Sequence, residues 1–550
     1  MPRYTIGVDF GSLSGRAVLV NTADGSVVAS AQLDYPHAIM DRSLPCGREL
    51  PADWALQHPQ DYLDVLAHTL PKLAEKVAPE DIVGIGLDCT ASTVLPVFAD
   101  GTPLCMTEAF EENPYAYVMM WKHHGAQRQA SRMTELALRR HEKWLPFYGG
   151  IVNAEWYFPK LLQVLEEAPE VYQAMAHYAE AVDWLVWQLT GTYTRSYGCL
   201  GYKSFYKDGS FPENSFFGEL NPAFEDVIEE KVSGPVASLG ACAGHLTEKA
   251  AARYGLRAGI PVAAGNIDAH VCVPAAGIDG SGKLLAIIGT STCHIVLGEQ
   301  AVPVPGMSGV VMEGVLPGLA AYEAGQSCVG DSFQWLEKNH ISEALKKEAD
   351  EKRISVQQLL TEKAAKLKPG QSGLLALDWW NGNRSVLADT DLTGLMLGMT
   401  LQTTPQEMYR ALLESTAYGA RMILEFYQKS GVPVEAFFAS GGISQKNELA
   451  MQIYADVLRM PVQIVDAAQG PALGSAIYAA VAAGEYADAA QGARKMGAKI
   501  SRTYQPVEEN VAVYEKLYLE YKTLHDYFGR GLNPVMKKLK ALRKGGYNHE

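Results

Sequence analysis

The chain has 550 residues, of which 48% are hydrophobic and 20% are charged, and its formal net charge is −15. This length and composition predict a globular protein of two or more domains. The acidity disfavours nucleic acid and anionic membranes as partners, and no apolar run approaches the roughly 18 residues of a membrane span.

Eight cysteines are spread over the chain without any CxxC pair: Cys46, Cys89, Cys105, Cys199, Cys242, Cys272, Cys293 and Cys328. Such spacing favours reduced, mostly buried thiols over a disulfide framework or a zinc site. The first residues enter a β-prone run, with no basic and apolar signal segment. We therefore expect a cytoplasmic protein.

Residues 4–20, YTIGVDFGSLSGRAVLV, predict a β-hairpin whose tip carries Asp9, Gly11, Ser12 and Arg16. Small residues let the backbone approach an anion, and successive N–H groups form a concave anion site. Asp9 suits a Mg²⁺ ion held largely through water, because Mg²⁺ takes few carboxylates. The alternative interpretation is an ordinary hairpin with a polar tip.

A buried strand is predicted over residues 82–89, and a small, hydroxyl-rich segment, 89–93, follows at its C-terminal end. Open α/β sheets tend to place ligand groups at that end of a strand. Helical periodicity follows over 156–167 and 171–189. Residues 193–230 are interpreted as an insertion or a lid-side segment, and the aromatic content of residues 204–219 has no evident local explanation.

Residues 260–265 predict a strand that ends just before Asp268. A carboxylate at the mouth of a strand is positioned to accept a proton from a substrate hydroxyl. The plain alternative is a helix N-cap or a turn residue. Small helical residues continue to Gly277, where we place the end of the first lobe.

The second half repeats the pattern of the first. Residues 283–297, KLLAIIGTSTCHIVL, predict strand, small turn at Gly289 and Thr290, and strand. A further glycine turn, at Gly441 and Gly442, follows an apolar run. Helices are also predicted over residues 405–429, 447–458 and 510–544.

These elements, in this order, resemble the superfamily of sugar kinases, Hsp70 and actin, and within it the FGGY carbohydrate kinases. The resemblance covers nearly the whole chain. It implies an α/β fold of two actin-like (ribonuclease H-like) ATPase lobes, each with a mixed five-stranded sheet, and an active-site cleft between them. The implied division is residues 1–277, with the sugar site and catalytic base, and 278–550, with the nucleotide site and a helical tail.

The same resemblance implies how ATP and Mg²⁺ are bound, with Asp9 as the metal residue. Both small turns would grip the phosphates, and the later glycine turn and the helix after it would flank the nucleoside. The implied nucleotide residues are Gly11, Ser12, Arg16, Gly289, Thr290, Gly441, Gly442 and Asn447. Ser12 stands where a threonine is more usual, and it keeps a hydroxyl. Without the resemblance, the later glycines indicate only a hairpin turn.

The sugar-facing segments resemble the branch of the family that phosphorylates L-ribulose. LDCTAST at 87–93 lacks the glutamine typical of xylulose and glycerol kinases, and WKHH at 121–124 replaces a more general Trp-x-Asp-x-Arg pattern. The resemblance implies Asp268 as the catalytic base. The implied ketopentose-binding residues are Ala91, Trp121, Lys203, Asp268 and Glu323. Polar groups matched to substrate hydroxyls discriminate strongly, because a missing hydroxyl leaves them unpaired.

Three of these side chains also have plain structural interpretations. Lys203 fits a surface lysine, Glu323 an edge charge that limits aggregation, and Trp121 core or rim packing. The histidines lack metal-ligand spacing, so we assign them no metal.

The expected activity is ATP-dependent phosphorylation of L-ribulose to L-ribulose 5-phosphate in arabinose catabolism. Two alternatives stay open: a related kinase acting on D-ribulose, xylulose or ribitol, and a non-catalytic nucleotide switch of the actin or Hsp70 type. A homodimer is expected from the resemblance alone.

Overall fold

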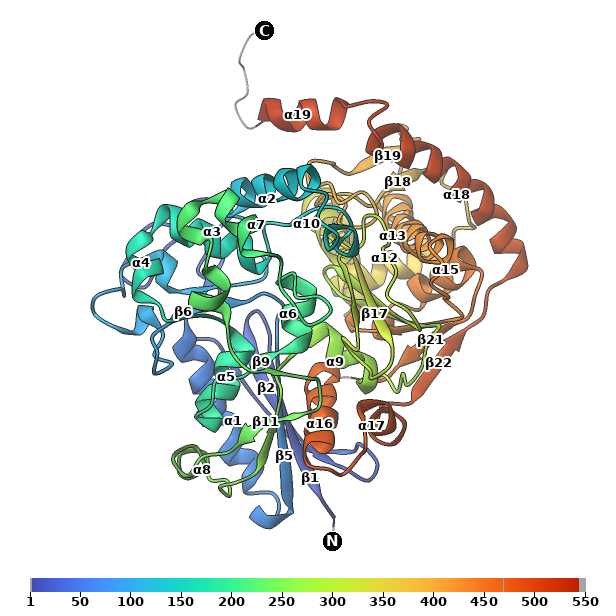
Figure 1. Cartoon of the computed structure of the whole chain (residues 1–550). Coiled ribbons are helices and arrows are strands. Elements are labelled where there is room, and N and C mark those ends of the chain that lie inside the picture. Colours follow the sequence, from blue (N-terminus) through green and yellow to red (C-terminus); the bar gives the residue numbers. More distant parts are fainter. Residues whose placement is uncertain (1, 468, 544–550) are drawn as a thin grey trace.

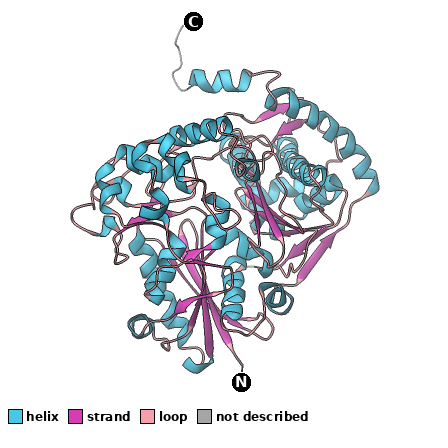
Figure 2. Cartoon of the chain, in the orientation of Figure 1, coloured by secondary structure: helices cyan, strands magenta, loops and turns pink. Residues whose placement is uncertain are grey.

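The computed structural model describes residues 2–467 and 469–543, which form two α/β lobes side by side (Figures 1 and 2). Each lobe contains a seven-stranded sheet. We call the chain up to Gly277 the N-terminal lobe and the remainder the C-terminal lobe. Within the described residues, no helix is long and apolar enough to cross a membrane.

The N-terminal sheet begins with the predicted hairpin, which the structure confirms. β1 pairs antiparallel with β2 and parallel with β5, and β2 pairs antiparallel with β3. β1 is buried along almost its whole length, so both of its faces pack against apolar neighbours. The strands are β1 (Tyr4–Phe10), β2 (Ser14–Asn21), β3 (Val27–Asp34), β5 (Ile82–Cys89), β11 (Cys242–His245), β12 (Pro261–Ala263) and β13 (Asn266–Ile267).

The C-terminal sheet repeats this pairing, because β14 is antiparallel to β15 and parallel to β20. The expectation of five strands per sheet was wrong. Short strands account for the difference: β11 lies at an edge of the N-terminal sheet and β13 pairs with β5, whereas β16 and β22 lie at the two edges of the C-terminal sheet. The strands are β14 (Lys283–Ile288), β15 (Thr292–Gly298), β16 (Gly309–Met312), β17 (Ala320–Gln326), β20 (Ala436–Ser440), β21 (Val462–Val465) and β22 (Ile500–Tyr504).

Three smaller sheets lie outside these two. Their strands are β4 (Leu56–Gln57), β6 (Val94–Val97), β7 (Val118–Met119) and β8 (His177–Glu180); β9 (Arg195–Ser196) and β10 (Val236–Ala237); β18 (Leu375–Leu377) and β19 (Leu395–Leu397).

Helices surround the sheets (Figure 2). In the N-terminal lobe they are α1 (Pro59–Ala74), α2 (Gln127–Arg139), α3 (Tyr157–Glu167), α4 (Pro169–Ala174), α5 (Ala181–Thr190), α6 (Tyr197–Lys203), α7 (Asn214–Leu220), α8 (Glu248–Tyr254) and α9 (Asp268–Ala275). In the C-terminal lobe they are α10 (Gly330–His340), α11 (Glu343–Lys352), α12 (Val356–Ala364), α13 (Pro405–Lys429), α14 (Gly442–Lys446), α15 (Glu448–Leu458), α16 (Gly470–Ala482), α17 (Ala489–Met496), α18 (Glu508–Gly529) and α19 (Val535–Arg543).

The helix predicted over 405–429 is confirmed as α13, which begins with a capping box formed by Thr404 and Glu407. The single helix predicted over 171–189 is wrong. The chain leaves α4 and forms β8, which pairs with β6 before α5 begins. The predicted tail is two helices, α18 and α19, and Lys544 lies outside the described residues.

The aromatic segment after α6 has a structural explanation. Phe205 stacks on Trp144 with ring centroids 4.3 Å apart, and on Phe158 at 5.3 Å. Phe217 packs on the same Phe158 ring at 4.8 Å. These rings belong to a hydrophobic core that is packed around α2, α3 and α7.

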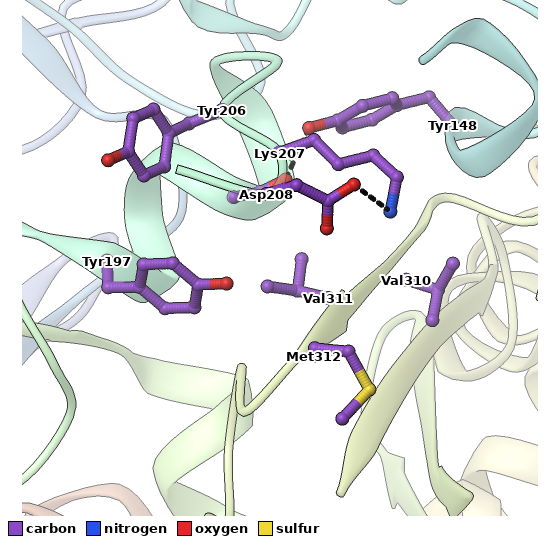
Figure 3. Close-up of a pocket in the computed structure, with 9 residues that line it drawn as sticks. Tyr148, Tyr197, Tyr206, Lys207, Asp208, Val310, Val311 and Met312 are labelled. Carbon is purple, nitrogen blue, oxygen red and sulfur yellow. Dashed lines mark hydrogen bonds and ion pairs between the residues drawn. The ribbon is translucent and has the colours of Figure 1, made fainter. Parts of the chain in front are cut away.

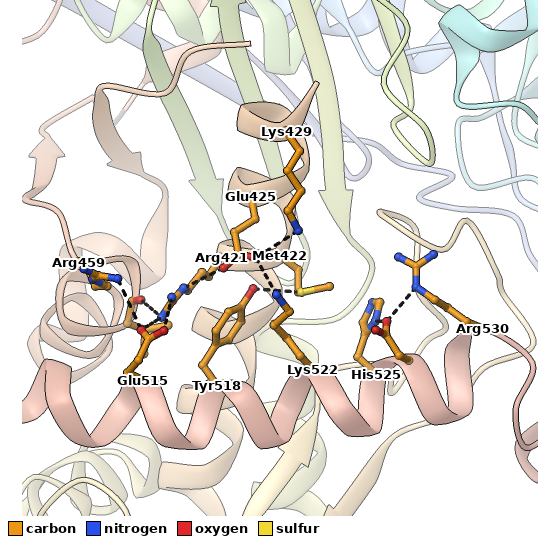
Figure 4. A network of polar contacts seen from close by, with 12 residues as sticks. Arg421, Met422, Glu425, Lys429, Arg459, Glu515, Tyr518, Lys522, His525 and Arg530 are labelled. Atoms are coloured by element: carbon orange, nitrogen blue, oxygen red, sulfur yellow. Dashed lines mark hydrogen bonds and ion pairs between the residues drawn. The ribbon is translucent and has the colours of Figure 1, made fainter. Parts of the chain in front are cut away.

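α18 closes the far side of the C-terminal lobe against α13 (Figure 4). Arg421 of α13 pairs with Glu515 at 2.8 Å, and its guanidinium lies 4.0 Å from the Tyr518 ring centroid. Lys522 reaches Glu425 at 3.1 Å. Stacking and ion pairing together hold α18 to α13.

One element crosses from the C-terminal lobe to the N-terminal sheet. α16 packs against β1, β5 and α9, and Figure 1 shows it beside the lower strands. Thr5 donates a hydrogen bond to the carbonyl of Ala476 at 2.9 Å. A Cβ on Gly7 would lie 1.8 Å from the Ala472 carbonyl oxygen, so only glycine allows this approach.

Candidate active site

Two of the predicted sugar residues, Lys203 and Glu323, meet from different elements, and His270 joins them. Lys203, at the end of α6, donates to Oε1 of Glu323 on β17 at 2.8 Å. His270 of α9 contacts the other carboxylate oxygen, Oε2, at 3.0 Å. Burial favours the protonated acid, but Lys203 and His270 hold the pKa of Glu323 well below its usual range. The two lobes therefore meet at an ionised carboxylate that has a polar partner on each of its oxygens.

Asp268 lies at the first turn of α9, beside this pair. One carboxylate oxygen accepts a hydrogen bond from the Ala269 N–H at 2.7 Å. Desolvation and the nearby negative charge of Asp9 raise the pKa of Asp268 to about 7. A group that titrates near neutrality is suited to general base chemistry.

Asp9 is the last residue but one of β1, and its neighbour across the sheet is Asp88 of β5. Burial raises the pKa of both carboxyls; Arg16, 3.6 Å from Asp9, opposes the rise at that residue, whereas Asp9 increases it at Asp88. Ser475 of α16 donates a hydrogen bond to Asp88 Oδ2. Within the described residues, Oδ1 of Asp88 has no hydrogen-bond partner.

The tip of the hairpin accepts hydrogen bonds from two residues outside it, one of which is the predicted sugar-binding residue Trp121. The indole N–H of Trp121 donates to the Ser12 hydroxyl at 3.0 Å, and Gln57 donates to the Ser12 carbonyl at 2.9 Å. The Gly11 N–H is used by the Ser14 carbonyl at 3.0 Å. Trp121 is therefore half-buried at the junction of the predicted phosphate and sugar sites.

The turn containing Gly289 and Thr290 connects β14 and β15 in the C-terminal lobe. Their carbonyls accept from the N–H groups of Gly330 at 3.0 Å and Val329 at 2.8 Å, at the start of α10. The Thr290 side chain is exposed. The structure thus brings a small turn and a helix start to the carboxyl end of β14.

Gly441 and Gly442 join β20 to α14. Gly441 has a φ of 92°, and a Cβ there would lie 2.6 Å from the Ile288 carbonyl oxygen. Gly442 is exposed and would have open space around a Cβ. Asn447 is buried; its side chain caps α15 by accepting from the Ala450 N–H at 3.0 Å. Asn447 therefore has a structural role as a helix cap in addition to its predicted role in nucleotide binding.

Ala91 lies in the turn after β5. Its neighbour Ser92 has a φ of 51°, and the Ser92 carbonyl accepts from the buried Lys160 ammonium at 2.7 Å. The turn that carries Ala91 is therefore fixed by the buried Lys160 side chain, whose pKa burial lowers to about 7 and which the sequence interpretation missed.

Four further polar residues at this site were given no role by the sequence interpretation: Asp88, Glu155, His270 and Arg384. Asp88 had a signal, since it precedes the hydroxyl-rich segment at a strand end. Glu155 and Arg384 lie 3.5 Å apart but far apart in the chain, and nothing local to either sequence segment indicates the pairing.

A small pocket lies near this region (Figure 3). It is lined by Tyr148, Tyr197, Gly201, Tyr206, Lys207, Asp208, Val310, Val311 and Met312. Tyr148 donates to the Gly201 carbonyl at 2.5 Å, and the Lys207 ammonium lies 3.6 Å from the Phe147 ring centroid. The pocket is a seam between α6 and β16, and it holds none of the predicted site residues.

The paired hairpin-led sheets, with small turns and acidic strand ends where the lobes meet, are the architecture of the actin-like ATPases. Among solved structures, a xylulose kinase from Rhodospirillum rubrum superposes with a TM-score of 0.79 at 25% identity, covering 97% of this chain and 100% of that one. A Plasmodium falciparum glycerol kinase has a TM-score of 0.73 at 16% identity, with 95% and 98% coverage.

Family comparison then refines the class. The N-terminal domain of the FGGY family of carbohydrate kinases matches residues 4–273, and the C-terminal domain matches residues 284–483. The chain belongs to the FGGY family. It is 51% identical to a ribulokinase of Bacillus licheniformis, with 96% of this chain and 98% of the relative covered. It is 49% identical to a ribulokinase of Mycolicibacterium smegmatis, with 100% and 98% covered.

Proposed function

We propose that this protein transfers the γ-phosphoryl group of ATP to the 5-hydroxyl of L-ribulose, giving L-ribulose 5-phosphate and ADP in arabinose catabolism. The observation that carries the proposal is Asp268, a carboxyl with a pKa near neutrality beside the Lys203–Glu323 pair. The near full-length similarity to ribulokinases supports the choice of sugar.

Asp268 acts as the base in this proposal. As the sugar hydroxyl oxygen attacks the γ-phosphorus in line, the new O–P bond forms and the bond to the β,γ-bridging oxygen breaks. The hydroxyl proton passes to the Asp268 carboxylate, and ADP leaves with the bridging oxygen. The partial desolvation that raises the pKa of Asp268 strengthens it as a proton acceptor.

Lys203 and Glu323 recognise the sugar hydroxyls, and Trp121 and the turn at Ala91 close the remaining sides. Glu323 has a partner on each oxygen, so its orientation is set before the sugar binds. Preorganised polar groups of this kind favour a substrate whose hydroxyls match them.

The phosphates lie, in this proposal, between the turns at Gly11–Ser12 and Gly289–Thr290, with Arg16 as the positive group. Arg16 and backbone N–H groups of these two turns would stabilise charge on the transferring group. The nucleoside would lie against Gly441, Gly442 and the α15 start at Asn447.

The residues around Asp9 fit a Mg²⁺ ion. Asp9 and Asp88 are buried together with raised pKa values, and Asp88 Oδ1 has no partner among the described residues. A divalent cation would favour the ionised form of both, and Mg²⁺ accepts one or two carboxylates plus waters and phosphate oxygens. Asp9 would hold the ion, which neutralises charge on the phosphates when bound. A cytoplasmic location and a homodimer belong to the proposal as family expectations.

The test is ADP release by purified protein with Mg²⁺ and a panel of L-ribulose, D-ribulose, L- and D-xylulose, ribitol, L-arabinose and glycerol. We expect the highest kcat/KM for L-ribulose. Equal rates on all four ketopentoses would make the assigned sugar wrong but leave a sugar kinase. ATP binding without stimulation by any sugar would overturn the kinase assignment in favour of a nucleotide switch.

A further inference from the structure

A second ion pair joins the two lobes near the sugar residues. Arg384, in the loop between β18 and β19, lies 3.5 Å from Oε1 of Glu155, which precedes α3. The same oxygen is contacted by His124 Nε2 at 2.9 Å. Glu155 belongs to the N-terminal lobe and Arg384 to the C-terminal lobe, so this contact exists only where the lobes meet.

The Arg384 loop is fixed directly to the strand that carries Glu323. The Gly325 N–H donates to the Ser385 hydroxyl at 3.1 Å. A Cβ on Gly325 would lie 2.8 Å from Cδ of Arg384, so the side-chain stem passes over β17 at a glycine. Any movement of β17 and Glu323 is therefore shared by Arg384.

Arg384 also lies close to Trp121, one of the predicted sugar-binding residues. Its guanidinium carbon lies 5.9 Å from the Trp121 ring centroid, within the range of cation–π contact. The edge of that indole is held by Ser12 at 3.0 Å. Trp121 is thus fixed from the N-terminal lobe by Ser12 and approached from the C-terminal lobe by Arg384.

The charges of the two pairs alternate between the lobes. Lys203 of the N-terminal lobe pairs with Glu323 of the C-terminal lobe at 2.8 Å, whereas Arg384 of the C-terminal lobe pairs with Glu155 of the N-terminal lobe. Although burial opposes ionisation of Glu155, Arg384 and His124 lower its pKa to about 2. Each of these ion pairs has one partner in each lobe. Separating the lobes would leave the charges unpaired, so the two pairs favour the arrangement in which the lobes are in contact.

We propose that Arg384 and Glu155 are positioning residues that set affinity for the sugar, by holding the C-terminal lobe against Trp121 and Glu323. This inference rests on the proposed function. The pair acts on the walls of the sugar site in the ground state and in the transition state alike. Its loss therefore weakens sugar binding more than it slows the chemical step.

The test compares Arg384→Met, Glu155→Gln and the double variant with the unsubstituted protein, using L-ribulose and ATP as varied substrates. We expect the KM for L-ribulose to rise about tenfold or more in each single variant, with kcat and the KM for ATP changed by less than about threefold. The KM for L-ribulose of the double variant should not exceed that of the single variant with the higher KM, because the two residues act as one unit. Arg384→Lys should recover part of the affinity, since it keeps the charge but loses the planar guanidinium.

Arg140→Met is the matched control. Arg140 pairs with Glu142 at 2.8 Å, and the side-chain exposures of 24% and 17% resemble the 26% and 18% of Arg384 and Glu155. All the polar partners of Arg140 given by the structure lie in the N-terminal lobe. The control should leave the KM for L-ribulose unchanged.

Two results would overturn the inference. An unchanged KM for L-ribulose in Arg384→Met, in a protein with sugar-stimulated turnover, would remove the positioning role and leave the proposed function intact. So would fully additive effects in the double variant. Absence of sugar-stimulated turnover in the unsubstituted protein would instead contradict the proposed function, and this inference with it.

Discussion

The pKa values of the Glu323 and Asp268 carboxyls are shifted in opposite directions, because the two groups have different neighbours. Lys203 and His270 lower the pKa of Glu323, whereas burial and the negative charge of Asp9 raise that of Asp268, which accepts a hydrogen bond from the Ala269 N–H. We predict that Asp268→Asn lowers kcat by about 10²- to 10⁴-fold, the range for losing a general base. Steady-state ADP release measures this, with sugar binding by calorimetry as the control. Retained turnover in a variant that still binds sugar would remove Asp268 from the base role.

The pKa of Asp268 also predicts two pH dependences. Because the base must be ionised, kcat/KM should fall about tenfold per pH unit below about 7. Because this pKa is higher in the folded protein than the ordinary 3.8, the carboxyl costs stability increasingly as pH rises from about 4 to 7. The melting temperature of Asp268→Asn should therefore exceed that of the unsubstituted protein by a margin that grows over this interval. A constant margin, or an acid limb near pH 4, would contradict the shifted pKa.

At the scale of elements, the turn from β20 to α14 separates a structural glycine from an accessible one. Gly441→Ala places a Cβ 2.6 Å from the Ile288 carbonyl oxygen at a φ of 92°, so we expect a loss of about 1–3 kcal/mol of stability. Gly442→Ala meets open space, so it should keep the stability and raise the KM for ATP. Denaturant unfolding and ATP saturation curves measure both. Equal stability of the two variants would contradict the geometric distinction.

Elements whose signals are local were predictable from the sequence, and those that depend on distant partners were not. The two hairpins follow from short apolar runs and small turns, and α13 follows from a proline at its start and a glycine after its end; the structure has all three where expected. The stretch 171–189 has helical periodicity throughout, but β8 forms inside it because β6 offers an edge to pair with. The insertion is aromatic because it completes a core with Trp144 and Phe158, residues distant in sequence.

The same distinction applies to the site. Lys203 and Glu323 were predicted by resemblance, and their direct pairing is a fact of the fold alone. The pairing of Glu155 with Arg384 carries no sequence signal, because an ion pair across two lobes has no fixed spacing in the chain. Resemblance transfers residues that touch a ligand more readily than the residues that hold those in place.

At the scale of the whole molecule, helix α16 of the C-terminal lobe packs into the N-terminal lobe and joins the two. Val18 and Val20 of β2 pack with Ala472 and Ile477 in one apolar cluster. Ser475 of the same helix bonds Asp88 beside the predicted metal site. The N-terminal sheet is therefore completed by a helix from late in the chain, and sequence division near Gly277 does not divide two separately packed cores.

This shared helix predicts how the protein unfolds. Gly474 lies inside α16, where alanine would ordinarily stabilise a helix by up to about 1 kcal/mol. A Cβ there would instead lie 2.0 Å from the Val271 carbonyl oxygen of α9. We expect Gly474→Ala to lower stability by about 2–3 kcal/mol, the cost of overpacking, and to shift one common calorimetric transition for both lobes. Gly280→Ala, which meets open space, is the control. Two transitions, of which Gly474→Ala moves only one, would show that the lobes unfold independently, because a shared helix must transmit the loss to both sheets.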